Sequence, residues 1–224
     1  MAAFSNPESV ARYAEGPLRQ VPGFLALQTM THLLLAERIG DEASVLVVGA
    51  GGGLELKVFA QAHSAWRFCG VDPSAEMLAL ATRTLGSLSS RVQLHEGYVD
   101  SAPFGPFDAA TCLLTLHFIP QEERLRTLKE IYLRLKPGAP LVVAHHSIPN
   151  EKDEKLKWLK RYAAFAAASG VVFANVENQI AAISERLPTL SPEQDEALLR
   201  AAGFVGVELF YAAFTFKGWV AYKP

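Results

Sequence analysis

Apolar residues along the chain follow two periods, one typical of buried strands and one typical of amphipathic helices. Short apolar runs bounded by turn residues predict five strands, at residues 45–48, 66–71, 92–96, within 106–120, and at 141–144. Amphipathic segments predict helices at residues 24–39, 54–63, 121–135, 151–169 and 192–202. Strands that alternate with helices favour an α/β fold with a mainly parallel sheet. Residues 205–210 and 214–222 predict a terminal antiparallel pair of strands.

A run of glycines follows the first predicted strand. Gly49, Gly51 and Gly53 come directly after four apolar residues, which indicates a buried strand that ends in a turn too tight for a Cβ atom. The helix predicted at 54–63 then begins with free N–H groups that face whatever lies over the glycines. A dinucleotide fold needs G-x-G-x-x-G, but its sixth position is Leu54 here. The turn therefore predicts a nucleotide-type pocket of another kind.

Asp72 stands at the end of the second predicted strand, where a carboxylate can accept hydrogen bonds from both hydroxyls of a ribose. Pro73 and Ser74 then open a helix, with Ser74 as its N-cap and Met77 placed to lie beside an adenine. The alternative for Asp72 is a simple helix cap. The spacing from the glycine turn agrees with a ribose ligand.

These features together resemble the class I S-adenosyl-L-methionine (SAM)-dependent methyltransferases. The resemblance is carried by G-x-G-x-G, by Asp72, by Asp108 at the entry to the fourth strand and by the Leu-x-Pro-Gly motif at 135–138. It implies a Rossmann-like, seven-stranded, mostly parallel sheet with helices on both faces, and SAM as the cofactor. The cofactor contacts that we expect from the turn and the strand ends are Gly49, Ala50, Gly51, Gly53, Asp72, Pro73, Met77, Tyr98 and Val99.

The loop after the third strand lies against the adenine in that family. The family usually has an acidic residue directly after the glycine of this loop, and Tyr98 stands there. Either Tyr98 stacks on the adenine or Asp100 takes the polar role, and both interpretations stay open.

Within this fold the chain looks like the bacterial carboxy-S-adenosylmethionine synthases, which act in tRNA wobble-uridine modification. The matching segments are residues 19–24, 115–118, 135–138 and 202–204. The resemblance implies further cofactor contacts at Phe24, where the family has a tyrosine, and at Leu113, where it has an asparagine. Ile180 stands where the family has the arginine that holds the extra carboxylate. A carboxylate beside Ile180 would lose a bidentate partner, so the carboxymethyl chemistry is not carried over.

Three histidines lie at the carboxyl ends of the fourth and fifth strands. His117 is the candidate general base for the acceptor, and its alternative role is that of a hydrogen-bonding spacer. His145 and His146 are adjacent and should point to opposite faces of a strand. Since the three have no spacing typical of zinc ligands, no metal site is expected.

Composition narrows the partners. A formal charge of −2 and a pI near 6.3 argue against an extended nucleic-acid footprint. Cys69 and Cys112 lie in apolar runs and are interpreted as reduced core residues of a cytoplasmic protein, and no apolar run approaches the length of a membrane span. We expect one domain over 1–224, with an N-terminal helical cover at 1–40 and a helical insertion or lid at 150–190.

The first hypothesis is therefore a SAM-dependent methyltransferase for a small-molecule acceptor, with a homodimer as the assembly considered. The second is a relative of the carboxy-S-adenosylmethionine synthases that keeps that reaction with a rearranged carboxylate site. The third is a SAM-binding protein without catalytic activity.

Overall fold

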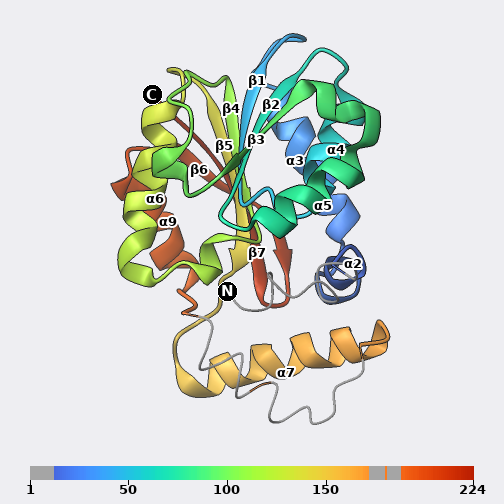
Figure 1. Ribbon diagram of the computed structural model, residues 1–224. Coiled ribbons are helices and arrows are strands. Elements are labelled where there is room, and N and C mark those ends of the chain that lie inside the picture. Colours follow the sequence, from blue (N-terminus) through green and yellow to red (C-terminus); the bar gives the residue numbers. More distant parts are fainter. Residues whose placement is uncertain (1–12, 172–179, 181–187) are drawn as a thin grey trace.

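A seven-stranded sheet with the order β3-β2-β1-β4-β5-β7-β6 forms the centre of the molecule (Figure 1). The computed structural model describes residues 13–171, 180 and 188–224. β7 runs antiparallel to both of its neighbours, and the other neighbouring strands are parallel, as predicted. The strands are β1 Ser44–Val48, β2 Arg67–Asp72, β3 Val92–Glu96, β4 Ala109–Leu113, β5 Pro140–His146, β6 Val205–Ala213 and β7 Phe216–Tyr222.

Helices cover both faces of the sheet (Figure 1). The α-helices are α2 Glu15–Gln20, α3 Phe24–Ala36, α4 Leu54–Ala62, α5 Ala75–Leu85, α6 Gln121–Arg134, α7 Lys152–Ala168 and α9 Pro192–Ala201. Short 3-10 helices are η2 Gly86–Arg91, η3 Val99–Ser101 and η4 Leu116–Phe118. The first face is covered by α3, α4 and α5, and the second by α6 and α9. α7 lies beyond the carboxyl ends of the parallel strands, beside α2.

β1 shows why the central strands are continuous apolar runs. Val45 and Val47 pack toward α3, α4 and α5, whereas Leu46 and Val48 pack toward α6 and α9. Successive side chains of a strand point to opposite faces, so a strand with helices on both faces needs apolar residues at every position. The buried run and the glycine turn after it therefore place the turn at the carboxyl edge of the sheet.

Two helix caps are present, at the starts of α5 and α9. Ser74 accepts a hydrogen bond from the Met77 N–H at the start of α5. Ser191 caps α9 in a reciprocal capping box with Gln194. These caps fix where each helix begins, and at Ser74 this also fixes the chain directly after Asp72.

The predicted end of the fifth strand was wrong by two residues. β5 continues through His145 and His146 because they pair with Lys217 and Phe216 of the antiparallel strand β7. A local apolar run cannot show this, since the pairing comes from a distant segment. In the expected insertion at 150–190, residues 150–171, 180 and 188–190 lie within the described part of the chain.

Candidate functional site

The glycine turn and Asp72 lie side by side because β1 and β2 are parallel neighbours, with Val48 opposite Val71. The Gly51 N–H donates to Asp72 Oδ2 at 2.9 Å, and the Ser74 N–H donates to Oδ1 at 2.9 Å. A carboxylate has about four acceptor positions, so hydroxyl groups of a ligand can still bind this one. Burial raises the pKa of Asp72, and the N–H groups of Ser74 and Gly51 oppose that shift.

Two glycines of the turn are required by packing within the fold. A Cβ atom on Gly49, whose φ is +77°, would lie 2.0 Å from Thr115 Oγ1. A Cβ atom on Gly53, whose φ is +78°, would lie 2.9 Å from the Cα of Ala81. The turn is thus locked between the exit of β4 and helix α5, with a left-handed backbone that favours glycine.

The residues predicted to hold the adenine follow β2 and β3. Met77 is buried and approaches the glycine turn, while Tyr98 is 56% exposed and Val99 is buried. Asp100 forms an ion pair with Arg126, at 2.9 Å from Nη2 to Oδ2. This pairing directs the Asp100 carboxylate toward α6.

Three apolar residues stand where the resembling family has polar ones, and the structure separates them into two groups. Phe24 begins α3 and Leu113 ends β4, and both are buried in the apolar cluster between the sheet and helices α3, α4 and α5. Ile180 belongs to a separate cluster beneath α7, with Ile148, Leu159 and Ala163. Its neighbours in this cluster, among the described residues, are therefore apolar.

Glu55 is a buried acid that the sequence analysis missed. It lies in the first turn of α4, directly after the glycines, and its Oε1 accepts a hydrogen bond from Thr111 Oγ1 at 2.8 Å. Burial raises the pKa of Glu55 to about 8, and the hydrogen bond from Thr111 opposes the shift. The position of Glu55 four residues before the buried Phe59 is the pattern that could have revealed it.

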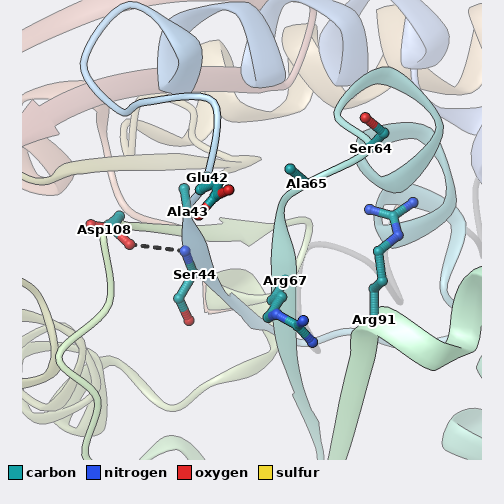
Figure 2. Close-up of a pocket in the computed structure, with 8 residues that line it drawn as sticks. All are labelled: Glu42, Ala43, Ser44, Ser64, Ala65, Arg67, Arg91 and Asp108. Carbon is teal, nitrogen blue, oxygen red and sulfur yellow. Dashed lines mark hydrogen bonds between the residues drawn. The ribbon is translucent and has the colours of Figure 1, made fainter.

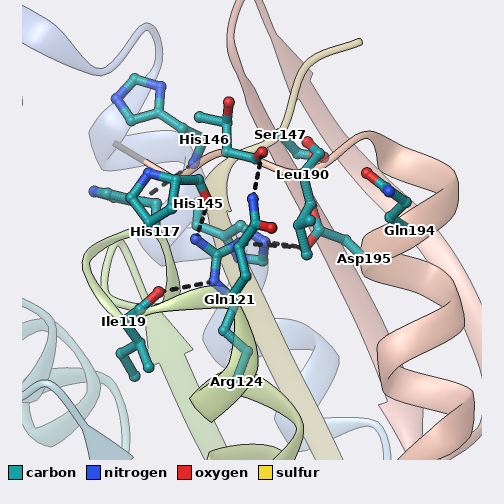
Figure 3. A network of polar contacts seen from close by, with 12 residues as sticks. His117, Ile119, Gln121, Arg124, His145, His146, Ser147, Leu190, Gln194 and Asp195 are labelled. Carbon is teal, nitrogen blue, oxygen red and sulfur yellow. Dashed lines mark hydrogen bonds and ion pairs between the residues drawn. The ribbon is translucent and has the colours of Figure 1, made fainter. Parts of the chain in front are cut away.

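A second buried polar network lies between β5, α6 and α9 (Figure 3). His145 Nε2 lies 3.1 Å from Asp195 Oδ1, and Arg124 Nη1 lies 4.0 Å from the same oxygen. All three side chains are at most 3% exposed. Within the described residues, no group of three or more His, Cys, Asp or Glu side chains could hold a metal ion.

His146 lies on the other side of β5, and His117 of η4 lies beside it. His146 Nδ1 is 2.9 Å from Thr215 Oγ1, and its ring stacks on Phe216 with 4.0 Å between the ring centroids. His145 and His146 thus point to opposite faces, as predicted. His117 Nδ1 accepts a hydrogen bond from the His146 N–H at 3.4 Å.

The environment of His117 determines which hydrogen-bonding role its imidazole can take. Burial holds the pKa of His117 well below its usual value, and the nearby His146, His145 and Arg124 lower it further. A neutral imidazole whose Nδ1 accepts a hydrogen bond carries its proton on Nε2. The geometry therefore favours His117 as a hydrogen-bond donor over a proton acceptor.

A surface hollow of about 370 Å³ lies at the opposite edge of the sheet (Figure 2). Ser44, Arg67, Arg91 and Asp108 line it at the amino ends of the strands. Asp108 is held by the Ser44 N–H and by Lys136, and the Arg91 guanidinium donates to backbone carbonyls around the end of α4. These groups serve the fold, and open α/β sheets bind ligands at the carboxyl edge instead.

In the described part of the chain, no helix is long and apolar enough to cross a membrane.

A family model described as a methyltransferase domain matches residues 45–138. The carboxy-S-adenosyl-L-methionine synthase of Chromohalobacter salexigens is 27% identical over 100% of this chain and 84% of its own length.

Two solved structures share the fold. A candidate O-methyltransferase of Nostoc punctiforme superposes with a TM-score of 0.69 at 20% identity, over 96% of this chain and 60% of its own. Human N-acetylserotonin methyltransferase in complex with SAM superposes with a TM-score of 0.65 at 16% identity, over 97% of this chain and 56% of its own. The chain thus spans less than two thirds of either protein, and at these identities the likeness concerns the fold.

Proposed function

We propose that the protein transfers a methyl group to a small-molecule acceptor. The premise is that this chain carries a class I SAM-dependent methyltransferase domain with S-adenosyl-L-methionine as its cofactor. The seven-stranded sheet and the similarity to known methyltransferases confirm the predicted fold, enzyme class and cofactor. The acceptor and the individual cofactor contacts are our proposal.

The observation that carries the proposal is the fixed carboxylate of Asp72 beside the glycine turn. Its two oxygens are oriented by the Gly51 and Ser74 N–H groups, and ribose hydroxyls are the donors that such a carboxylate can still accept. SAM supplies a sulfonium methyl group that is intrinsically reactive. The chain therefore has to align the acceptor with that methyl group and exclude water.

The remaining cofactor contacts follow from the same edge of the sheet. We assign the methionine end to the glycine turn, the ribose to Asp72, and the adenine to the residues after β2 and β3. The full set is Phe24, Gly49, Ala50, Gly51, Gly53, Asp72, Pro73, Met77, Tyr98, Val99 and Leu113. We assign His117 to the acceptor as a hydrogen-bond donor. Its Nδ1 accepts a hydrogen bond from the His146 N–H, so its proton lies on Nε2 and can be donated.

A small acceptor agrees with the cover over the carboxyl edge of the sheet. The Tyr162 hydroxyl of α7 donates to Gln20 Oε1 of α2 at 3.3 Å, and the Tyr211 hydroxyl donates to the Pro22 carbonyl. These bonds tie the N-terminal helices to α7 and to the terminal strands. The net charge of −2 gives no support to a nucleic-acid acceptor. A homodimer stays a prediction.

A carboxy-S-adenosylmethionine synthase activity is the second candidate, because a curated relative with that name aligns with the whole chain. Against it stands Ile180, buried beside Ile148 and Leu159, where a carboxylate would be desolvated without a partner. Mass spectrometry of the ligand that copurifies separates the two candidates, since the carboxylated cofactor is heavier. SAM binding with no methylated acceptor in any extract would instead favour a non-catalytic SAM-binding protein.

Calorimetry with SAM and with NAD tests the cofactor assignment. We expect SAM to bind and NAD to give no signal, because the turn lacks the third glycine of the dinucleotide pattern at Leu54. Tight NAD binding together with silence toward SAM would overturn the proposal.

A further inference from the structure

Tyr13 lies directly on the glycine turn. Its hydroxyl oxygen is 3.0 Å from the place where a Cβ atom of Gly51 would stand, and its ring Cδ1 is 2.7 Å from the corresponding place at Gly52. Because neither glycine has a Cβ atom, the ring can pack against the backbone of both. A residue 36 or more positions away from the turn in sequence thus forms part of its surface.

Three side chains converge at Gly51. The Tyr13 hydroxyl and the Met77 Cε lie 3.0 and 3.5 Å from the same Cβ position, and the Gly51 N–H donates to Asp72. Burial and the nearby carboxyl groups of Glu55 and Asp72 raise the pKa of Tyr13 to about 12. The phenol therefore stays neutral and can both donate and accept a hydrogen bond.

The glycines divide into two pairs by what fills the space beside them. The space at Gly49 and Gly53 is filled by Thr115 and Ala81, which belong to the exit of β4 and to α5. The space at Gly51 and Gly52 is filled mainly by Tyr13, which lies two residues before the short helix α2. The first pair serves the packing of the fold, and the second pair admits a residue of the N-terminal cover.

We propose that Tyr13 is a cofactor-contacting residue, which closes the ribose end of the SAM site with its hydroxyl beside Asp72. Gly51 and Gly52 are the residues that admit its ring. The inference rests on the proposed function, because it assigns one more contact to the same cofactor site.

Calorimetry with SAM on two variants measures this contact. In Tyr13→Phe the lost hydroxyl should weaken binding by about threefold to tenfold, the effect of a typical hydrogen bond. In Tyr13→Ala the ring is lost as well, and binding should weaken by about tenfold to a hundredfold. Tyr132→Phe is the matched control, since Tyr132 packs on Phe204 between α6 and α9 and should leave the affinity unchanged.

A double-mutant cycle with Gly52→Ala locates the effect at the turn. Gly52 has no left-handed backbone, so alanine is tolerated there, but its Cβ atom would displace the Tyr13 ring. Gly52→Ala should therefore weaken SAM binding in the parent protein and should have little further effect in the Tyr13→Ala background.

The outcomes separate the inference from the proposed function. Wild-type protein and Tyr132→Phe that both fail to bind SAM would overturn both proposals. If the wild type binds SAM, and Tyr13→Ala binds it with equal or higher affinity, only the contact at Tyr13 is overturned. Thermal unfolding without ligand shows whether Tyr13→Ala folds. If it does not, the contact at Tyr13 is tested with Tyr13→Phe instead. Unchanged SAM affinity in Tyr13→Phe, with additive effects of Tyr13→Phe and Gly52→Ala, would overturn that contact.

Discussion

Two buried carboxyl groups, Glu55 and Asp195, lie on opposite faces of the same sheet and have opposite surroundings. Glu55 has the Thr111 hydroxyl as its hydrogen-bond partner at 2.8 Å, and burial raises its pKa to about 8. Asp195 lies 3.1 Å from His145 Nε2 and 4.0 Å from Arg124 Nη1. Glu55 is thus held neutral near neutral pH, whereas Asp195 faces a guanidinium that is always charged.

The two acids therefore differ in their partners: a neutral hydroxyl contacts Glu55, whose pKa burial raises, whereas a guanidinium supplies a counter-charge beside Asp195. The neutral acid lies under the glycine turn, on the side of the sheet where we place the cofactor. The ion pair lies between α6 and α9, where it connects β5 to both helices. The effects of substitutions at the two acids on the free energy of unfolding should therefore differ in size and in their dependence on pH.

The largest effect is expected at Asp195. Asp195→Ala leaves the Arg124 guanidinium, whose side chain is 1% exposed, without its counter-charge. The free energy of unfolding should fall by about 3 to 5 kcal/mol, as for other buried pairs that lose one partner. Urea unfolding at pH 7 measures it.

Lys157→Ala is the control for that experiment. Lys157 pairs with Glu154 on α7, and both side chains are more than 40% exposed, at 44% and 46%. An exposed pair contributes about 0 to 1 kcal/mol. Equal losses in the two variants would contradict the assignment of Asp195 to a buried ion pair.

A smaller effect is expected at Asp72, a half-buried carboxyl group to which we assign the ribose of the cofactor. Asp72→Ala should weaken SAM binding by about tenfold to a hundredfold, since hydrogen bonds to a charged group contribute about 1.5 to 3 kcal/mol. Calorimetry on folded protein measures the change.

Asp108→Ala is the matched control for Asp72→Ala. Asp108 also accepts a hydrogen bond from a backbone N–H, that of Ser44 at 2.9 Å, but it lies at the amino edge of the sheet (Figure 2). Its SAM affinity should equal that of the wild type. If Asp72→Ala behaves like Asp108→Ala, the ribose contact is lost from the proposal.

The ligand side of the sheet was largely predictable because its pattern is local. Four apolar residues followed by glycines give a buried strand and a tight turn, and an acid after the next strand must lie beside that turn in a parallel sheet. The structure confirms the sheet and places Asp72 against Gly51. The contacts to SAM itself stay predictions.

Three buried ionisable side chains were missed because each lies on a helix that also carries exposed polar residues. These residues are Glu55, Arg124 and Asp195. Each lies four positions before a buried apolar residue of its own helix, namely Phe59, Leu128 and Leu199. That spacing places an ionisable side chain on the apolar face. Its partner comes from a distant segment, as Thr111 does for Glu55, and a single sequence does not reveal it.

The smallest effect is expected at Glu55, and its dependence on pH distinguishes it from Asp195. Its pKa rises from the ordinary 4.5 to about 8 on folding, so the folded state binds the proton more tightly. The resulting stabilisation is complete below pH 4.5 and is lost as the pH rises to about 8. Glu55→Gln keeps an acceptor for Thr111 but has no proton to lose.

The free energy of unfolding of the wild type, relative to Glu55→Gln, should therefore fall by about 1 to 2 kcal/mol between pH 6 and pH 7.5. Urea unfolding of both proteins at the two pH values measures this difference, and titrations shared by the two proteins cancel in it. Parallel pH profiles would show that Glu55 is already ionised in the folded state. An ionised Glu55 would need a cationic partner, which its Thr111 hydrogen bond does not supply.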